Sequence, residues 1–162
     1  GRRLLLRRRR LSTVTAEEID RHLIVNVRAT LLLTQAFPQQ HAGRPGGRVI
    51  TLISGQELGP MERELAYSAS KAAVNNLANS RSSLLIKKRI TVNAVNPGGT
   101  NTGWEGPEAE KQVAHWPLGR WGEPDDAARL IAWLCTDDAS WSTRQPINSE
   151  GGFRRWNWSP EK

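Results

Sequence analysis

Cysteine, tyrosine, methionine and phenylalanine are scarce in this sequence of 162 residues, which contains one, one, one and two of them. The lone Cys135 cannot form an internal disulfide, so nothing supports an oxidising compartment. The three histidines, His22, His41 and His115, are far apart and lack the spacing of a zinc site. No apolar stretch approaches the roughly 20 residues that cross a bilayer. These absences predict a cytoplasmic protein of one domain that holds no metal and does not enter a membrane.

Acidic residues are absent from the opening stretch GRRLLLRRRR. Its six arginines account for six of the net charge of +7, which leaves +1 for residues 11–162. A basic run binds phosphates without sequence preference, so nucleic-acid binding is one interpretation. The nearly neutral remainder favours another, in which residues 1–14 form a basic, disordered N-terminal segment. We therefore expect no specific nucleic-acid partner.

Apolar residues first recur at helical spacing after the stretch TAEE. This stretch is typical of a capping box, in which the hydroxyl of Thr15 accepts a hydrogen bond from the amide of Glu18. The pattern predicts a helix that continues to about Gln40. The apolar stripe of that helix is expected to comprise Ile19, Leu23, Val27 and Leu31.

Two short apolar runs rich in β-branched residues, 48–54 and 89–95, predict buried parallel strands. Between them the sequence predicts a second helix over residues 67–87. The buried side of this helix is expected to comprise Ala69, Ala72, Ala73, Leu77, Leu84 and Leu85.

The last part of the chain continues the alternation of helix and strand. Pro124 suits the first turn of a helix over residues 124–136, and residues 145–152 contain a last short strand. This order predicts an α/β fold with a parallel sheet of about three strands flanked by helices. In such sheets ligands bind beyond the carboxyl ends of the strands. We assign residues 15–153 to one domain and residues 154–162 to a C-terminal tail.

The only tyrosine, Tyr67, stands four residues before Lys71 in the stretch YSASK. Residues four apart on a helix are neighbours, so the ammonium is expected beside the phenol. A phenol of pKa about 10 is a poor acid–base group near neutrality, and a neighbouring cation favours its anion. Such a pair suits proton delivery to a carbonyl oxygen that gains negative charge.

Ser54, followed thirteen residues later by Tyr-x-x-x-Lys, resembles the short-chain dehydrogenase/reductase family. Four further stretches match in family order: IVNVRATLLLTQA, NAVNPGGTNT, GRWGEPDDAARLIAWLCTDDAS and INSEGG. The pattern is most similar to 3-oxoacyl-(acyl carrier protein) reductase-like members. The resemblance implies a truncated Rossmann-like sheet over residues 15–153. It also implies NAD or NADP as cofactor, with hydride transferred to a ketone or 3-oxoacyl group, or from an alcohol.

The resemblance implies a role for each residue of the set. Tyr67 would donate or accept the proton, and Lys71 would lower its pKa and bind the nicotinamide ribose. Ser54 would hydrogen-bond the substrate oxygen, and Asn26 would hold a water that links the lysine to solvent. Trp104 would lie in the lid over a small carbonyl or alcohol substrate. The loop expected to contact the cofactor comprises Pro97, Gly98, Gly99, Thr100 and Thr102.

The glycine-rich TGxxxGxG turn that holds the cofactor pyrophosphate in this family is missing from the sequence. The chain therefore resembles the C-terminal portion of a reductase, with Arg144 where the family usually has glycine. Two interpretations stay open: an oxidoreductase fragment, or a catalytically silent remnant that acts as an assembly or interaction module. The resemblance also implies a homo-oligomer formed through the helices around 15–40 and 67–87.

Overall fold

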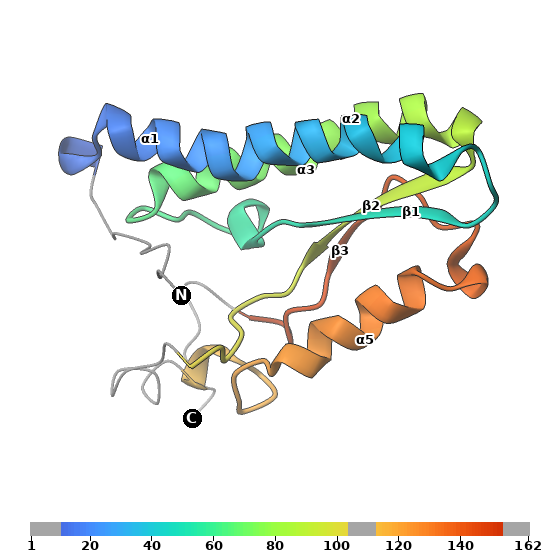
Figure 1. Cartoon of the computed structure of the whole chain (residues 1–162). Coiled ribbons are helices and arrows are strands. Elements are labelled where there is room, and N and C mark those ends of the chain that lie inside the picture. The colour runs from blue at the N-terminus through green and yellow to red at the C-terminus, as the bar shows by residue number, and fades with distance from the viewer. Residues whose placement is uncertain (1–10, 104–112, 154–162) are drawn as a thin grey trace.

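A computed structural model describes residues 11–103 and 113–153 of the chain (Figure 1). Its sheet is parallel, with the strand order β1-β2-β3. The strands are β1 (Gly47–Leu52), β2 (Ile90–Asn96) and β3 (Pro146–Asn148). The predicted α/β fold with three parallel strands is confirmed.

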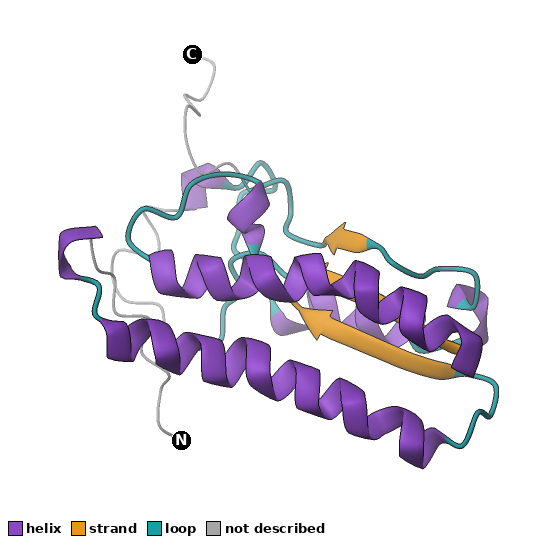
Figure 2. Cartoon of the chain, turned by 90° about the horizontal axis from the view of Figure 1, so that it is seen from above, coloured by secondary structure: helices purple, strands orange, loops and turns teal. Residues whose placement is uncertain are grey.

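Helices cover both faces of this sheet. They are α1 (Ala16–His22), α2 (Ala29–His41), α3 (Leu65–Leu85) and α5 (Pro124–Leu134). Figure 1 shows α2 and α3 above the strands and α5 below them. A π-helical segment, Leu23–Arg28, joins α1 directly to α2, and the resulting long helix runs beside α3 (Figure 2). Its start is capped as predicted, because the Glu18 amide donates to the Thr15 hydroxyl over 3.3 Å.

The hydrophobic core lies on both sides of β2, whose seven residues are all buried. One cluster lies between the sheet and the layer that contains α2 and α3, and a second lies between the sheet and α5. The buried members of the first cluster are Ile53, Val74, Ala78, Leu85, Ile90, Val92 and Ala94. Those of the second are Val95, Leu134 and Ala139. Both layers of helices therefore pack against the middle strand, β2.

The buried face of α3 differs from the predicted one. Of the expected residues only Leu85 is buried, whereas Ala69 is exposed and Leu84 is 73% exposed. The buried side chains of α3 include several small or polar ones: Ala66, Ser70, Val74, Asn75, Ala78, Arg81, Ser82 and Leu85. Small side chains let the helix approach the sheet closely, and they carry little hydrophobic signal in a sequence.

The predicted apolar stripe of the first helix is also largely wrong. Val27 packs against the core, but Ile19, Leu23 and Leu31 are 39–40% exposed. The π-helical segment explains the difference, because a π turn contains one residue more than an α turn. It therefore rotates the stripe of α1 relative to that of α2.

Several predictions concern the ends of the chain. Leu11–Thr13 form a short 3₁₀ turn inside the segment expected to be disordered, while residues 1–10 and the tail 154–162 lie outside the described residues. Trp104 lies outside them too.

Within the described ranges no helix combines the length and apolarity needed to traverse a lipid bilayer. In that same part of the chain, no group of three or more histidine, cysteine, aspartate or glutamate side chains is placed so that it could hold a metal ion.

Candidate active site

Tyr67 and Lys71 lie on the first two turns of α3. The side-chain nitrogen of Lys71 is 5.7 Å from the centre of the Tyr67 ring, within the range of a cation–π contact. The same ammonium donates a 2.8 Å hydrogen bond to the backbone carbonyl of Leu52, the last residue of β1. The lysine thus bridges the helix and the carboxyl end of the strand.

Burial lowers the pKa of Lys71, because the charged ammonium loses hydration among these elements. Among the described residues no carboxylate forms an ion pair with it. A half-buried cation that has lost part of its hydration and has no counter-charge favours the anionic form of a neighbouring group. The Tyr67 phenol is such a group.

Ser54 follows β1 in an extended conformation, with φ −143° and ψ 176°. Its amide donates a 3.1 Å hydrogen bond to the side-chain oxygen of Gln56, which shapes the short turn Gly55–Glu57. That turn is tied to α3, because the side-chain amide of Asn75 donates to the carboxylate of Glu57. Ser54 therefore stands at the carboxyl end of the strand, beside the helix that carries the tyrosine.

Asn26 lies in the π-helical segment. Its side-chain amide donates a 2.9 Å hydrogen bond to the hydroxyl of Ser70, which in turn donates a 2.7 Å bond to the Tyr67 carbonyl. The Thr30 hydroxyl donates to the Asn26 carbonyl over 2.6 Å. Asn26 is thus coupled to the backbone of the tyrosine, and π-helical turns occur frequently at functional sites.

His22 is a neighbour of the tyrosine that the sequence reasoning missed. It is 9% exposed, and its ring centre is 5.8 Å from that of Tyr67 in an edge-on arrangement. Burial is the main cause that lowers the pKa of His22. The one available signal was its position four residues before Asn26, which places both on one helix face.

The loop that follows β2 starts at the carboxyl end of that strand. Because β1 and β2 are parallel, this is the same end of the sheet at which Ser54 follows β1. The Asn96 side chain accepts a 3.0 Å hydrogen bond from the Gly98 amide and donates a 3.0 Å bond to Asn148. Gly98 has φ +68°, and a Cβ there would overlap the side chain of Glu150. Glycine is therefore required at this position, both for its backbone angle and for space.

The rest of this predicted cofactor loop is held by the segment that precedes α5 (Pro124–Leu134). The Thr100 hydroxyl donates to the Pro97 carbonyl over 3.2 Å, and a Cβ on Gly99 would come within 2.6 Å of Trp116. The amide of Asn101 donates to the Gly122 carbonyl over 2.7 Å. Thr102, also predicted to contact cofactor, is exposed.

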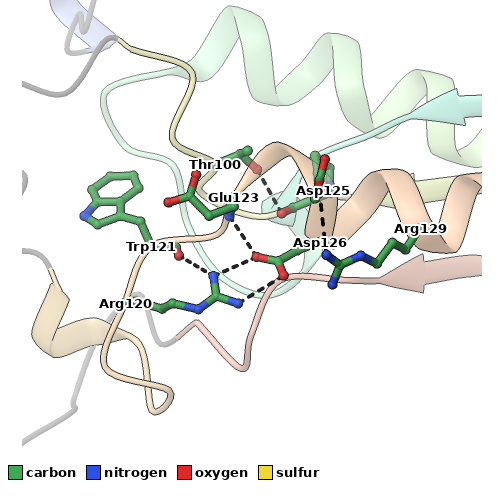
Figure 3. Close-up of polar contacts among 8 residues, drawn as sticks. Thr100, Arg120, Trp121, Glu123, Asp125, Asp126 and Arg129 are labelled. Carbon is green, nitrogen blue, oxygen red and sulfur yellow. Dashed lines mark hydrogen bonds and ion pairs between the residues drawn. The ribbon is translucent and has the colours of Figure 1, made fainter.

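The start of α5 is fixed by an ion pair (Figure 3). Arg120 donates to both carboxylate oxygens of Asp126, over 2.7 and 3.0 Å, and to the Trp121 carbonyl over 2.7 Å. The Glu123 amide donates to the same carboxylate over 2.8 Å. The hydrogen bond from Arg120 is the main cause that lowers the pKa of Asp126 to about 2.

Comparison with known proteins decides the family. Residues 4–154 match a family model described as enoyl-(acyl carrier protein) reductase. The chain belongs to the short-chain dehydrogenase/reductase family. It is 44% identical over 146 residues to the uncharacterized oxidoreductase YjdA of Bacillus subtilis, covering 88% of this chain and 58% of that protein. It is 32% identical to dehydrogenase/reductase SDR family member 4 of Bos taurus, over 88% of this chain and 53% of that protein.

The fold is also similar to that of solved structures in this family. The angucycline C-6 ketoreductase LanV with bound NADP has a TM-score of 0.82 and 32% sequence identity. That alignment covers 91% of this chain and 58% of LanV. The chain thus spans less than two thirds of the length of the relatives that it matches.

Proposed function

We propose that this chain carries the proton-transfer part of the active site of an NAD(P)-dependent oxidoreductase. The reaction interconverts a ketone or 3-oxoacyl group and the corresponding alcohol. The observation that carries the proposal is the half-buried ammonium of Lys71, 5.7 Å from the Tyr67 ring centre and bonded to the end of β1. A partly dehydrated cation beside a phenol at the carboxyl end of the sheet suits acid–base catalysis near neutrality.

Each residue acts on a stated atom. Tyr67 donates its phenolic proton to the carbonyl oxygen during reduction and accepts a proton from the hydroxyl during oxidation. Ser54 hydrogen-bonds the same substrate oxygen. Lys71 stabilises the phenolate that remains after proton transfer, which costs less beside a cation than in its absence. Asn26, coupled to the tyrosine backbone through Ser70, holds a water that returns protons from solvent to the lysine.

The residues present fit a nicotinamide nucleotide in part. An ammonium has three N–H donors, and Lys71 uses one of them on Leu52. The others are available to ribose hydroxyls, and the loop from Pro97 to Thr102 lies at the same edge of the sheet. When bound, the nicotinamide supplies or accepts the hydride.

The partners follow from the site and from the exposed surface. The substrate is a small carbonyl or alcohol compound in the cytoplasm. The chain forms a homo-oligomer through the long first helix and α3. Supporting this, consecutive leucines of α2, Leu31, Leu32 and Leu33, are 40–71% exposed. Adjacent exposed leucines are typical of an interaction surface.

Cofactor titration tests the proposal directly. NADH or NADPH is added to the chain while the fluorescence of its seven tryptophans is followed. We expect saturable quenching, weakened in Lys71→Ala and unchanged in Lys88→Ala, which removes an exposed lysine just after α3. The absence of saturation at millimolar cofactor would favour the alternative, a silent remnant acting only in assembly.

A further inference from the structure

His22 contacts the ring of Tyr67 from the neighbouring helix. It is the last residue of α1 and is 9% exposed. The two ring centres are 5.8 Å apart, and the ring planes are inclined at 70° to each other. Edge-to-face pairs at this separation are favourable, because the positive edge of one ring meets the negative face of the other. The imidazole therefore restrains the orientation of the phenol ring.

The helix that carries His22 is fastened to α3 one turn further along the chain. There Asn26 donates to the hydroxyl of Ser70, which donates to the backbone carbonyl of Tyr67. Within the described part of the chain no hydrogen bond holds the imidazole itself. Hydrogen bonds thus fix the backbone of the tyrosine, whereas its ring meets His22 through packing. A change at the imidazole therefore acts on the ring first.

Four charged side chains act on the imidazole of His22. Two lie on its own helix and two on α3 or its N-cap: Glu18, Arg21, Glu64 and Lys71. The two acids raise the pKa of His22 and the two bases lower it, so these charges oppose one another. Burial is the largest effect, and it places that pKa below the ordinary value of 6.5. The imidazole is therefore neutral at neutral pH.

Protonation of His22 would weaken its contact with Tyr67. A base whose pKa is lowered by its surroundings destabilises those surroundings when it gains a proton. The imidazolium needs hydration that a residue 9% exposed does not obtain in place. It would also be a second cation near a ring whose centre is 5.7 Å from the ammonium of Lys71. Both effects favour movement of the imidazolium away from the phenol.

We propose that His22 is a positioning residue, whose neutral imidazole holds the ring of Tyr67 in place and whose imidazolium releases it. This role rests on the proposed function, in which Tyr67 transfers the proton. The proton that releases the ring comes from solvent and goes to a ring nitrogen of His22, and no bond to the tyrosine forms or breaks. The fraction of chains with an aligned phenol should therefore fall as pH falls below 6.5.

Tyr67 and Lys71 alone predict a different response to acid. Below about pH 6.5 the phenol keeps its proton and the ammonium keeps its charge. Reduction of a carbonyl uses the protonated phenol, so this pair by itself loses no rate in acid. An acid loss needs another titrating group, and His22 is in contact with the ring.

The lone tyrosine allows a test by NMR on the full 162-residue chain. When tyrosine is labelled with carbon-13 in its ring, the signals come from one ring only. Their shifts and line widths are followed between about pH 7 and pH 5, without cofactor or substrate. His22→Phe keeps an uncharged aromatic ring at the contact, whereas His22→Ala removes the ring.

His41→Phe is the matched control. Like His22, His41 is 9% exposed and ends a helix, and it stacks on Phe37. It lies about 28 Å further along the same long helix and so is remote from the tyrosine. The control therefore removes a buried histidine of the same kind and leaves the contact with Tyr67 in place.

We expect the Tyr67 signals of the unchanged chain to move in one step, with a midpoint below 6.5 that the ring protons of His22 share. His22→Phe should lack the step and keep an ordered ring throughout. His22→Ala should also lack it, with lines averaged by ring motion at every pH. His41→Phe should keep the step. In reduction of a small ketone by NADPH, the rate should fall about tenfold per pH unit below the midpoint, and His22→Phe should lose this fall.

Tyr67 signals that stay constant in the unchanged chain would overturn the proposal, as would a step that survives in His22→Phe or one that disappears in His41→Phe. Equal ring order in His22→Ala and the unchanged chain would overturn it too, since the histidine would then only fill space. A chain that shows the step but reduces no ketone would support the contact and contradict the proposed reaction. Circular dichroism at each pH confirms that folded proteins are compared.

Discussion

The ammonium of Lys71 lies 5.7 Å from the centre of the Tyr67 ring while it is bonded to the end of β1. This arrangement fixes the cation independently of any ligand. The lysine is held by a backbone carbonyl, which keeps its charge beside the phenol in the chain without ligand. The electrostatic help that the proposed reaction needs is thus built into the folded chain.

Removing this cation should change the pH dependence of alcohol oxidation. Lys71 stabilises the phenolate, so in Lys71→Met the rising limb of the rate should move to higher pH, by about 1–3 units. In the unchanged chain the stabilisation of the phenolate is lost as pH rises through the pKa of Lys71, because the lysine then loses its charge. Because burial lowers that pKa from 10.5, the decline should begin below pH 10.5. Initial rates across a pH series provide the measurement.

Lys88→Met, which removes an exposed lysine, is the matched control and should leave the profile in place. An unshifted rising limb in Lys71→Met would mean that this ammonium does not tune the phenol.

Leu32 tests the proposed oligomer. It is 52% exposed on α2, and Leu32→Asp places a charge on the surface that we expect to be buried between copies. Sedimentation should show self-association weakened at least about tenfold, because an unpaired charge buried in an interface is costly. The control, Gln40→Asp, adds the same charge to an exposed polar position on the same helix. Equal association of both variants, or a monomeric unchanged chain, would contradict the proposal.

Asp126 gives the fold a predictable response to acid. Its pKa falls to about 2 in the folded chain, against about 3.9 in an unfolded one. A carboxyl with a lowered folded pKa stabilises the fold fully above its unfolded value and loses that effect as pH falls toward the folded value. Asp126→Asn should therefore unfold at a lower temperature than the unchanged chain at pH 6. The difference should shrink between about pH 4 and pH 2. A difference that is constant across these pH values would show that the ion pair with Arg120 is not its cause.

Arg144 occupies a backbone conformation that suits glycine. Its φ is +66°, and its amide donates a 2.7 Å hydrogen bond to the Val92 carbonyl, which glycine at this position would retain. Arg144→Gly should raise the free energy of unfolding by about 1 kcal/mol, because only glycine adopts this angle without a Cβ penalty. Urea unfolding measures the change. Arg129→Gly, within helix α5, should instead lower the free energy of unfolding by about 1 kcal/mol, because glycine is unfavourable inside a helix. Destabilisation by both would refute the strain at Arg144.

Local sequence patterns were sufficient to predict the helices and strands and the proximity of Tyr67 and Lys71. Capping at Thr15, the β-branched strands and the proline of α5 each depend on residues within one or two turns of one another. The four-residue spacing of Tyr67 and Lys71 belongs to the same class, since any α-helix brings such residues together. These features could therefore be predicted from the sequence alone.

Features that depend on packing between distant segments could not be predicted. The position of His22 beside Tyr67 and the bond from Lys71 to Leu52 arise only when the helices lie on the sheet. The buried face of α3 was misjudged because both sides of that helix carry small residues. Arginine is rarely fully buried, so no sequence pattern indicated the burial of Arg81. In each case packing between the helices and the sheet determines which side chains are buried.

The central claim is that Tyr67 delivers the proton that accompanies hydride transfer to a carbonyl. The most direct test mixes the chain with a small ketone and NADPH deuterated at the transferable position, and then measures the alcohol by mass spectrometry. We predict an alcohol with deuterium on the carbinol carbon, formed about 10²–10⁴-fold more slowly by Tyr67→Phe. Labelled alcohol formed equally fast by Tyr67→Phe, or no labelled alcohol from the unchanged chain, would contradict the account.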